Sequence, residues 1–391
     1  MFRLILAASL GLSIASGANA ASCGGDFAAF VKELKSEARA AGHEAATVDR
    51  FFAGVSQTKS VLKADRAQGV FQKDFAAFSQ SLISRNRMEN GQARAKKYAK
   101  TFARIEASYG ISPGVLLAFW GLETDFGQVQ GDFNTLNALV TLAHDCRRPE
   151  LFRPQVFAAL TLYEQGNFDP ARTIGAWAGE IGQVQMLPAD ILRNGVDGDG
   201  DGKIDLKGSS PDALMSGAKM LSSLGWRPGE PWLQEVTVPK DLDWSLSGLN
   251  QSLPASQWQA MGVAARTGKL PGNLNAALLL PMGRKGPAFL AYPNFRVYFE
   301  WNKSFVYVTT AAYFATRLDG APVVDFGAPE QGLSGNELKL LQERLARRGH
   351  DVGKIDGILG ALTRDAVQKE QMRLGLPADA WPTPALLAKL K

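Results

Sequence analysis

Residues 115–127 read Val-Leu-Leu-Ala-Phe-Trp-Gly-Leu-Glu-Thr-Asp-Phe-Gly, an apolar run that ends at one carboxylate, Glu123. Ser112 can cap a helix here, with Pro113 at the first helical position. On that helix Phe119 and Glu123 share a face. Burial raises the pKa of a carboxyl, and such a group can donate a proton near neutral pH. By spacing alone, however, a helix-end glutamate that reaches water is the commoner case.

The N-terminus predicts export. An apolar segment, residues 4–15, is followed by the small-x-small sequence at 18–20, so residues 1–20 are interpreted as a signal peptide too short to span a bilayer. Cys23 offers a site for lipid attachment, but residues 20–22 lack the large aliphatic side chain usual before such a cysteine. We therefore expect an exported chain without a lipid anchor, and no later segment is long and apolar enough to cross a membrane.

Cysteine usage agrees with an oxidising compartment. The chain has two cysteines, Cys23 and Cys146, and an even number in an exported protein favours a disulfide. The alternative is two unpaired thiols. A bridge between them would tie the N-terminal segment to the body of the fold.

Composition excludes some classes of function. With 391 residues and 46% hydrophobic content, the chain is globular and large enough for more than one core. The formal net charge is only +5, and no basic cluster alternates with aromatics, so nucleic acid is not an expected partner. A mildly basic exported protein would suit an anionic polymer of the cell wall.

Hydrophobic periodicity divides the chain and predicts a mainly α (α+β) protein. Residues 26–220 show helical spacing, whereas residues 235–308 contain short β-prone runs among Gly and Pro, before a last helix near 308–317. We expect a large domain over 21–318, a linker over 319–333 and a small helical module over 334–391.

A second polar segment, residues 177–188, contains two glutamines, Gln183 and Gln185, among glycines. Glycines allow close approach of the backbone, and amide side chains offer the paired donor and acceptor that sugars need. The alternative is a purely structural segment, because a glycine-rich turn before a helix would show the same sequence pattern.

Residues 197–205 match the first half of an EF-hand loop, with carboxylates at positions 1, 3, 5 and 9. Gly208 stands at position 12, where the bidentate acid belongs, so weak binding is expected. We predict a structural Ca²⁺ site, with an empty acidic turn as the alternative. The candidate ligands are Asp197, Asp199, Asp201, Lys203, Asp205 and Ser209.

Together these motifs resemble those of the B-type lytic murein transglycosylases. The matching parts are the Glu-Thr-x-Phe-Gly sequence at 123–127, the Gly-x-x-Gln-x-x-Pro sequence at 182–188, the Asp-rich loop that follows, and residues 294–304. The resemblance covers residues 26–318. It implies a lysozyme-like helical catalytic domain with short mixed β segments that cleaves the glycan strands of peptidoglycan in the periplasm.

The C-terminal module resembles the three-helix peptidoglycan-binding domain of wall hydrolases. The evidence is a Leu-x-x-Leu-Gln-x-x-Leu pattern at 338–345 and a turn, Asp-Gly-x-x-Gly, at 356–360. Departures are Glu370-Gln371, where an aromatic residue usually precedes the Gln, and Trp381 near the second turn. These departures put ligand binding in doubt, and a generic helical hairpin is the alternative.

The resemblance implies a monomeric enzyme with one acid, Glu123, and no cofactor for catalysis. We interpret Asp125, two residues on, as a cap or surface residue that points away from it. The substrate-binding residues implied are Gln185, Arg147, Arg148, Asn294, Trp301 and Asn302. The arginines could instead be a solvated pair, and Trp301 an interior side chain. A muramidase that uses water and a non-catalytic wall-binding scaffold remain as alternative functions; a water-using enzyme needs a second carboxylate.

Overall fold

The computed structural model describes residues 23–67 and 73–391, so the predicted signal peptide lies outside the described residues. Within this part the chain is mainly helical, as predicted, and no helix is long and apolar enough to cross a bilayer. The helices are α1 (Phe27–Ala40), α2 (Ala45–Phe51), α3 (Lys59–Arg66), α4 (Phe75–Leu82), α5 (Arg85–Lys97), α6 (Ala99–Tyr109), α7 (Pro113–Thr124), α8 (Thr135–His144), α9 (Pro149–Glu164), α10 (Pro188–Asn194), α11 (Ser210–Ser223), α12 (Ala255–Ala260), α13 (Pro293–Trp301), α14 (Phe305–Leu318), α15 (Gly335–Arg347), α16 (Ala361–Arg373) and α17 (Pro384–Lys389). The strands are β1 (Phe133–Asn134), β2 (Ile174–Gly175), β3 (Leu233–Thr237), β4 (Leu253–Pro254), β5 (Ala264–Ala265), β6 (Asn275–Leu279) and β7 (Ala288–Ala291).

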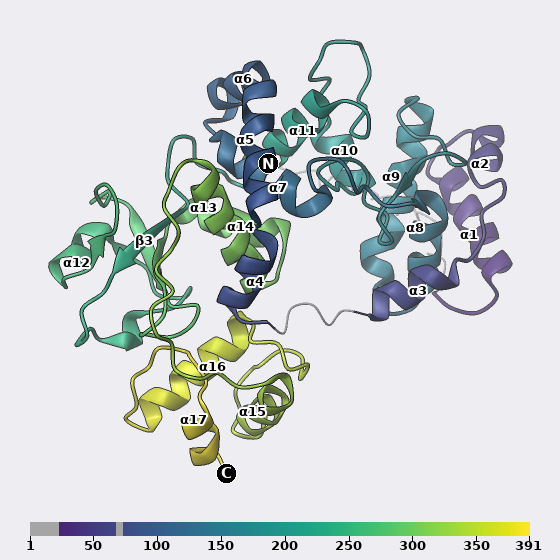
Figure 1. The fold of residues 1–391 in the computed structure, drawn as a ribbon. Coiled ribbons are helices and arrows are strands. Elements are labelled where there is room, and N and C mark those ends of the chain that lie inside the picture. Colours follow the sequence, from purple (N-terminus) through teal and green to yellow (C-terminus); the bar gives the residue numbers. More distant parts are fainter. Residues whose placement is uncertain (1–22, 68–72) are drawn as a thin grey trace, which may run out of the picture.

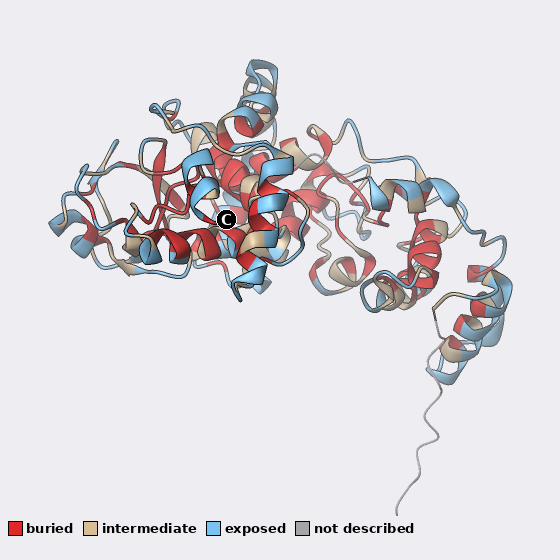
Figure 2. Cartoon of the chain, turned by 90° about the horizontal axis from the view of Figure 1, so that it is seen from below, coloured by how far each residue is buried: buried red, intermediate tan, exposed pale blue. Residues whose placement is uncertain are grey.

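Helix α7 lies in the middle of the molecule and packs lengthwise against α14 (Figure 1). It begins as predicted, with Ser112 as the N-cap and Pro113 in the first turn. Gly114 permits the close packing, because a Cβ there would meet the Ala315 carbonyl oxygen at 2.5 Å. Nearly every residue of α7 is buried, and the buried segments in Figure 2 run through the centre of the molecule. The helix therefore provides a rigid floor under its last turn.

On the right of Figure 1, helices α1 to α3 pack against α8 and α9. Cys23 and Cys146 form a disulfide with a Cα–Cα distance of 5.2 Å, which attaches the start of the described chain to the end of α8. The His144 ring meets Phe27 and Phe30 edge to face. Together these contacts fix the N-terminal helix on the helical body.

On the left of Figure 1, a five-stranded antiparallel sheet has the order β4-β6-β7-β3-β5. Central strands β6 and β7 are almost entirely buried, which explains their continuous apolar sequences. One face packs with α12 into a separate core around Trp258, whose indole nitrogen donates to the Ala276 carbonyl at 2.8 Å. The predicted β-prone runs at 235–238 and 277–281 fall on β3 and β6.

The C-terminal module, yellow in Figure 1, folds as three helices, α15 to α17, around its own apolar core. Ser334 and Glu337 form a capping box at the start of α15. The Asp-Gly-x-x-Gly turn is held by Gln342, whose side-chain oxygen accepts from the backbone amides of Asp356 and Gly357. The module thus has the compact form predicted from its leucine pattern.

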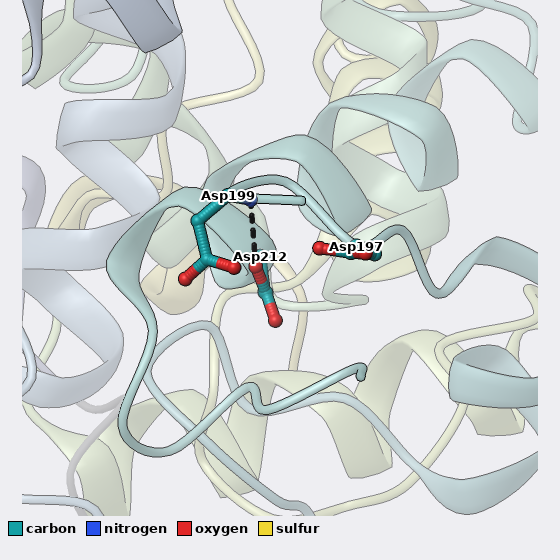
Figure 3. Close-up of side chains that lie close together, drawn as sticks. All are labelled: Asp197, Asp199 and Asp212. Atoms are coloured by element: carbon teal, nitrogen blue, oxygen red, sulfur yellow. Dashed lines mark hydrogen bonds between the residues drawn. The ribbon is translucent and has the colours of Figure 1, made fainter. Parts of the chain in front are cut away.

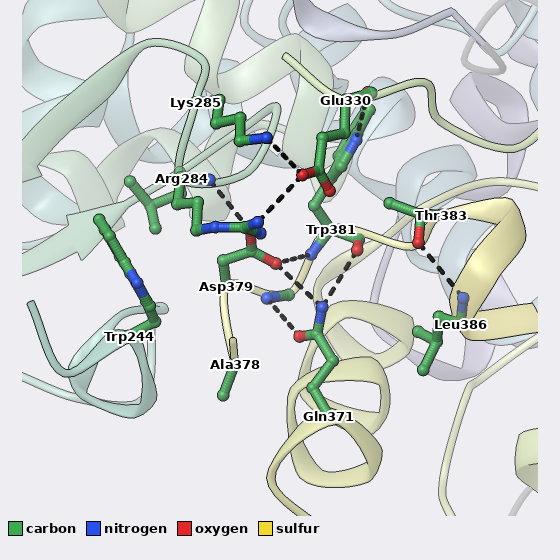
Figure 4. Close-up of polar contacts among 12 residues, drawn as sticks. Trp244, Arg284, Lys285, Glu330, Gln371, Ala378, Asp379, Trp381, Thr383 and Leu386 are labelled. Carbon is green, nitrogen blue, oxygen red and sulfur yellow. Dashed lines mark hydrogen bonds and ion pairs between the residues drawn. The ribbon is translucent and has the colours of Figure 1, made fainter. Parts of the chain in front are cut away.

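The module is joined to the rest of the chain by a buried polar network (Figure 4). Arg284, from the loop before β7, lies 3.1 Å from Asp379 of the module and 2.9 Å from Glu330 of the linker. The Trp381 indole donates to the Glu330 carbonyl, and the Gln371 amide donates to Asp379. Gln371 and Trp381, the latter one of the departures from the family pattern, are therefore buried in the seam between the domains. The other departure, Glu370, is buried within the module, where it pairs with His350 and Arg373.

Candidate active site

Glu123 occupies the last turn of α7, where two aromatic side chains donate to one carboxylate oxygen. The indole nitrogen of Trp301 lies 3.1 Å from Glu123 Oε1, and the Tyr307 hydroxyl donates to the same atom. Trp301 ends α13 and Tyr307 lies in the first turn of α14, so three helices fix the carboxyl. Only part of the Glu123 surface remains exposed.

The surroundings favour a protonated Glu123. Burial raises the pKa of Glu123, whereas the hydrogen bonds from Tyr307 and Trp301 act in the opposite direction and favour the carboxylate. Burial, together with the negative charge of Glu123, raises the pKa of Tyr307, which therefore stays a neutral donor. A carboxyl held between these effects is suited to give up a proton and to take one back.

Trp301 supports the acid with its ring as well as its N–H. The ring stacks on Phe119 of α7 with centroids 4.3 Å apart and an interplanar angle of 27°. Phe119 in turn stacks on Tyr298. Of the two interpretations left open by the sequence, the structure therefore places most of the Trp301 ring against protein, with its polar edge on Glu123.

The glycine-glutamine segment, residues 179–186, lies directly beside the end of α7. The Thr124 hydroxyl donates to the Gln183 carbonyl at 2.6 Å. The Gln183 side chain is buried and bonds inward to Lys207 and Ser210, so it is not available to a ligand. Gln185 is partly exposed and has a left-handed backbone with φ of +53°, an uncommon conformation for a non-glycine residue. Of the two glutamines, only Gln185 remains a candidate for contacting a sugar.

Glu180, in the same segment, is a second partly buried carboxyl that no sequence motif indicated. Burial raises the pKa of Glu180 to about 7; the charge of Glu123 adds to the rise and that of Arg148 opposes it. Glu180 therefore lies within electrostatic reach of the candidate acid. Asp125, by contrast, caps α7 and pairs with Arg87 at 3.2 Å, as expected of a cap residue.

The predicted arginine pair is attached to one buried carboxylate. Arg147 Nε lies 2.7 Å from Asp65 of α3, and Arg148 also pairs with Asp65, which is 1% exposed. Each arginine keeps about a third of its side chain exposed (38% and 33%). Contact of the pair with substrate stays a prediction, but the pair also has a structural role in fixing the start of α9.

Asn294 is not a sugar-binding residue. It is fully buried, and its amide donates to the carbonyls of Arg227 and Glu230 while its oxygen accepts from the Arg227 amide. The structure contradicts the prediction for Asn294: the helix turns this side chain inward, where its bonds are with backbone groups of the loop at 227–230. Asn302 is partly exposed, and its oxygen accepts from the Ser304 amide at the start of α14.

The Asp-rich loop brings together three carboxylates, of which the sequence pattern identified two. Oxygens of Asp197, Asp199 and Asp212 all lie within 4.8 Å of one another (Figure 3). Asp212, in the first turn of α11, is fully buried and accepts from the amides of Gly198 and Asp205. Asp212 thus adds a third carboxylate to the two that the loop itself supplies.

The other predicted ligands lie outside this three-acid cluster. Asp201 and Asp205 accept bonds from backbone amides of their own turns, and Ser209 caps α11 while donating to Asp199. Lys203 is exposed. Three carboxylates are hard oxygen donors of the kind that Ca²⁺ takes, so the residues present fit this ion.

The loop and the acid are connected through hydrogen bonds. The Gln183 amide donates to the Leu206 carbonyl at 2.9 Å, and the Gln183 side chain donates to the Lys207 carbonyl at 3.1 Å. Because Gln183 also accepts from Thr124, the end of the Asp-rich loop supports the turn beside Glu123.

The comparisons with known proteins agree with this geometry. Residues 26–316 match the transglycosylase SLT domain family, and residues 334–390 match the peptidoglycan binding domain family. The chain belongs to the transglycosylase SLT family. The resemblance stated from the motifs is thereby confirmed.

Relatives of this transglycosylase include the membrane-bound lytic murein transglycosylase B of Escherichia coli K12, 28% identical over 58% of the chain. The match spans 62% of that relative's length. The structure of SltB3 from Pseudomonas aeruginosa, in complex with NAG-anhNAM-pentapeptide, is 39% identical with a TM-score of 0.85, covering 94% of this chain and 100% of that one. The E. coli lytic transglycosylase Slt35 in complex with calcium is 25% identical with a TM-score of 0.65, covering 77% of this chain and 96% of that one.

Three functional candidates of the transglycosylase escaped the motif analysis: Tyr307, Glu180 and Asp212. Two had a local signal. Glu180 is an acid inside a glycine-rich segment, and Asp212 is an acid in a first helical turn just after an Asp-rich loop. Tyr307 had none, because the helix axis that directs it to Glu123 is set by packing of α14 on α7.

Proposed function

We propose that this protein is a lytic transglycosylase that cleaves the bond between N-acetylmuramic acid and N-acetylglucosamine in peptidoglycan and leaves 1,6-anhydromuramyl ends. The observation that carries the proposal is the setting of Glu123: a carboxyl whose pKa is raised by burial, with two aromatic donors on one oxygen.

Glu123 first donates its proton to the glycosidic oxygen, and the bond from that oxygen to the anomeric carbon breaks. The positive charge that develops on the sugar is balanced by the new carboxylate. Trp301 and Tyr307 stabilise this carboxylate through their hydrogen bonds. Glu123 then takes the proton of the muramyl 6-hydroxyl, whose oxygen bonds to the anomeric carbon, and the acid is restored.

The C-terminal module supports peptidoglycan as the partner. A wall polymer is a substrate outside the cytoplasm, so we infer an extracytoplasmic, periplasmic enzyme that is exported by the predicted signal peptide and acts as a monomer. The ion pairs around Arg284 join the module to the catalytic domain, so that both can engage one region of the polymer.

We further propose a structural Ca²⁺ held by Asp197, Asp199 and Asp212. The ion would neutralise three neighbouring carboxylates and stiffen the loop that supports Gln183. It takes no part in the chemistry at Glu123.

Two other functions are tested against the proposal. A muramidase that uses water is favoured by one observation, the second carboxyl Glu180 near Glu123. A scaffold without catalysis would not need the raised pKa of Glu123.

One digestion separates the three functions. Purified peptidoglycan is treated with the protein in H₂¹⁸O, and the muropeptides are analysed by mass spectrometry. Transglycosylation gives anhydro ends without ¹⁸O, hydrolysis gives reducing ends that carry one ¹⁸O, and a scaffold releases nothing. Anhydro ends free of label are the expected result; labelled ends or no release would overturn it.

A further inference from the structure

One side chain of α16, Arg364, crosses the seam between the C-terminal module and the catalytic domain. Its terminal nitrogens donate to the backbone carbonyls of Leu280 and Pro281, the second at 2.7 Å. Its Cζ lies 4.4 Å from the centroid of the Phe305 ring, which is the geometry of a cation–π contact. Arg364 therefore joins the module both to the end of β6 and to the first residue of α14.

The charge of Arg364 is stabilised by these same contacts. Burial lowers the pKa of Arg364 to about 9, so the guanidinium stays charged at neutral pH. Asp379, whose negative charge opposes this fall, is itself paired with Arg284 at 3.1 Å. The buried Nε of Arg364 has no hydrogen-bond partner among the described residues. The two carbonyls and the Phe305 ring are therefore the groups that stabilise this cation directly.

Two cavities border the contact between Arg364 and Phe305. The larger one, of about 280 Å³, is lined by both side chains and by Phe299 and Leu362. The smaller one, of about 50 Å³, is lined by the same pair and by Leu338. Atoms that line a void lack packing partners on that side. Removal of the guanidinium would therefore leave the Phe305 ring with room to move.

Phe305 connects this contact to the acid. It is the first residue of α14, and Tyr307, two residues later, donates to Glu123. The Phe305 ring also packs near Phe299 of α13, with centroids 6.4 Å apart, and α13 ends at Trp301, the second donor to Glu123. Phe305 thus belongs to one of the two helices that supply donors to the acid and contacts the other.

The connection between the two helices, residues 302–304, is held by local bonds. The Asn302 side chain accepts from the Ser304 amide at 2.9 Å, and the Ser304 side chain accepts from the Tyr307 amide at 3.4 Å. Such bonds fix the shape of the turn but not its place in the fold. Its place depends on packing, to which Phe305 contributes a buried ring.

We propose that Arg364 of the C-terminal module is a positioning residue for the reaction. By holding the Phe305 ring it fixes the first turn of α14, and so keeps the Tyr307 hydroxyl on Glu123. Besides contacting the polymer, the module then completes the setting of the acid. The inference rests on the proposed function.

The test is the kinetics of Arg364→Met on short, soluble glycan strands, which need no attachment to the wall. Methionine keeps an unbranched apolar side chain but removes the cation and its donors. The kcat should fall by about tenfold, as for the loss of a hydrogen bond to a charged group, while KM stays within about twofold. The matched control is Arg344→Met, because Arg344 also donates to a backbone carbonyl at 2.7 Å, that of Leu387, but within the module. This control should keep the kcat and KM of the wild type.

A double-mutant cycle shows whether Arg364 acts through Tyr307. In a Tyr307→Phe background, Arg364→Met should change kcat by less than about twofold, because the donor that Arg364 positions is already gone. A general loss of folded protein would lower kcat by the same factor in both backgrounds, and that result would overturn the proposal.

Phe305→Leu repeats the test from the catalytic side without a change in the module. It should lower kcat as Arg364→Met does, with KM again unchanged. This variant keeps the proposal testable even if Arg364→Met fails to fold, since wild-type kinetics in Phe305→Leu would refute it.

The outcomes distinguish this inference from the proposed function. If the wild type releases no muropeptides, the function fails and the inference fails with it. If release is normal and Arg364→Met keeps the kcat of the wild type, the inference alone fails. A raised KM with an unchanged kcat would show that Arg364 contributes to substrate binding only, which also overturns the positioning role.

Discussion

The indole N–H of Trp301 donates to the Glu123 carboxylate across 178 residues of sequence, at 3.1 Å. The bond comes from a ring that is itself immobilised by stacking on Phe119, so the acid is oriented by the packing of α13 on α7. Tyr307 adds a second donor to the same oxygen. Both hydrogen bonds favour the ionised form of Glu123 and so oppose the effect of burial, which favours the neutral form.

Removing one donor should shift the pH profile. Tyr307→Phe removes a hydrogen bond that stabilises the ionised form of Glu123, so the pKa of Glu123 should rise further. The acid then stays protonated to higher pH, and the alkaline limb of the rate profile moves to higher pH. The maximal rate should fall by about tenfold, since a hydrogen bond to a charged group contributes roughly 1.5–3 kcal/mol. The measurement is kcat against pH. Tyr298→Phe is the control, because that hydroxyl is buried without a partner among the described residues and should give an unshifted limb.

The disulfide should contribute to stability. Cys23 and Cys146 close a loop with a sequence separation of 123, for which the chain-entropy model predicts about 5 kcal/mol. Urea unfolding of the wild type with and without a reductant should show a clear fall in midpoint. The double variant Cys23→Ser, Cys146→Ser should unfold at the lower urea midpoint both with and without the reductant. Equal midpoints in all four samples would mean that the α1 contacts alone fix the N-terminus.

Calcium should raise the melting temperature through the three-acid cluster. Asp199→Asn should abolish most of the rise, because it removes one of three carboxylates that converge. Asp201→Asn should retain it, although the EF-hand pattern ranks Asp201 equally, because the Asp201 side chain accepts from the Lys203 amide outside the cluster. Thermal unfolding with calcium or with a chelator measures both. If both variants lost the calcium-dependent rise in melting temperature equally, the result would support the ligand set expected from the sequence instead of the three-acid cluster.

The seam between the domains should depend on Arg284 much more than on Lys285. Arg284→Met leaves Asp379, 3% exposed, without its counter-ion and should cost about 3 kcal/mol. Lys285→Met removes a solvent-exposed pair with Glu330 and should cost less than about 1 kcal/mol. Calorimetry should resolve a separate, earlier transition of the module in Arg284→Met only. A single unchanged transition in that variant would mean that apolar contacts around Trp381 hold the seam.

Local signals in the sequence account for what was predicted correctly. Ser112 and Pro113 mark the start of α7, and the β-prone runs at 235–238 and 277–281 mark β3 and β6, because capping and strand patterns depend on neighbours in the chain. The leucine pattern of the module likewise depends on one helix at a time.

What could not be predicted depends on contacts between distant segments. Asn294 lies beside a site-like motif, but the rotation of α13 turns it into the interior. Asp212 joins the Asp-rich loop because α11 folds back over it. The pKa of Glu180 is raised by burial and by the charge of Glu123, which depend on the fold and on no spacing in the sequence.

In the proposed reaction Glu123 supplies the proton that breaks the glycosidic bond, and muropeptide release by Glu123→Gln tests this role most directly. The amide matches the acid in size and keeps the acceptor for Trp301 and Tyr307, so the variant should fold and still bind peptidoglycan. Its release of anhydro-muropeptides should fall by at least about 100-fold, the usual contribution of a general acid. A folded Glu123→Gln protein that releases anhydro ends at a rate near that of the wild type would contradict the claim.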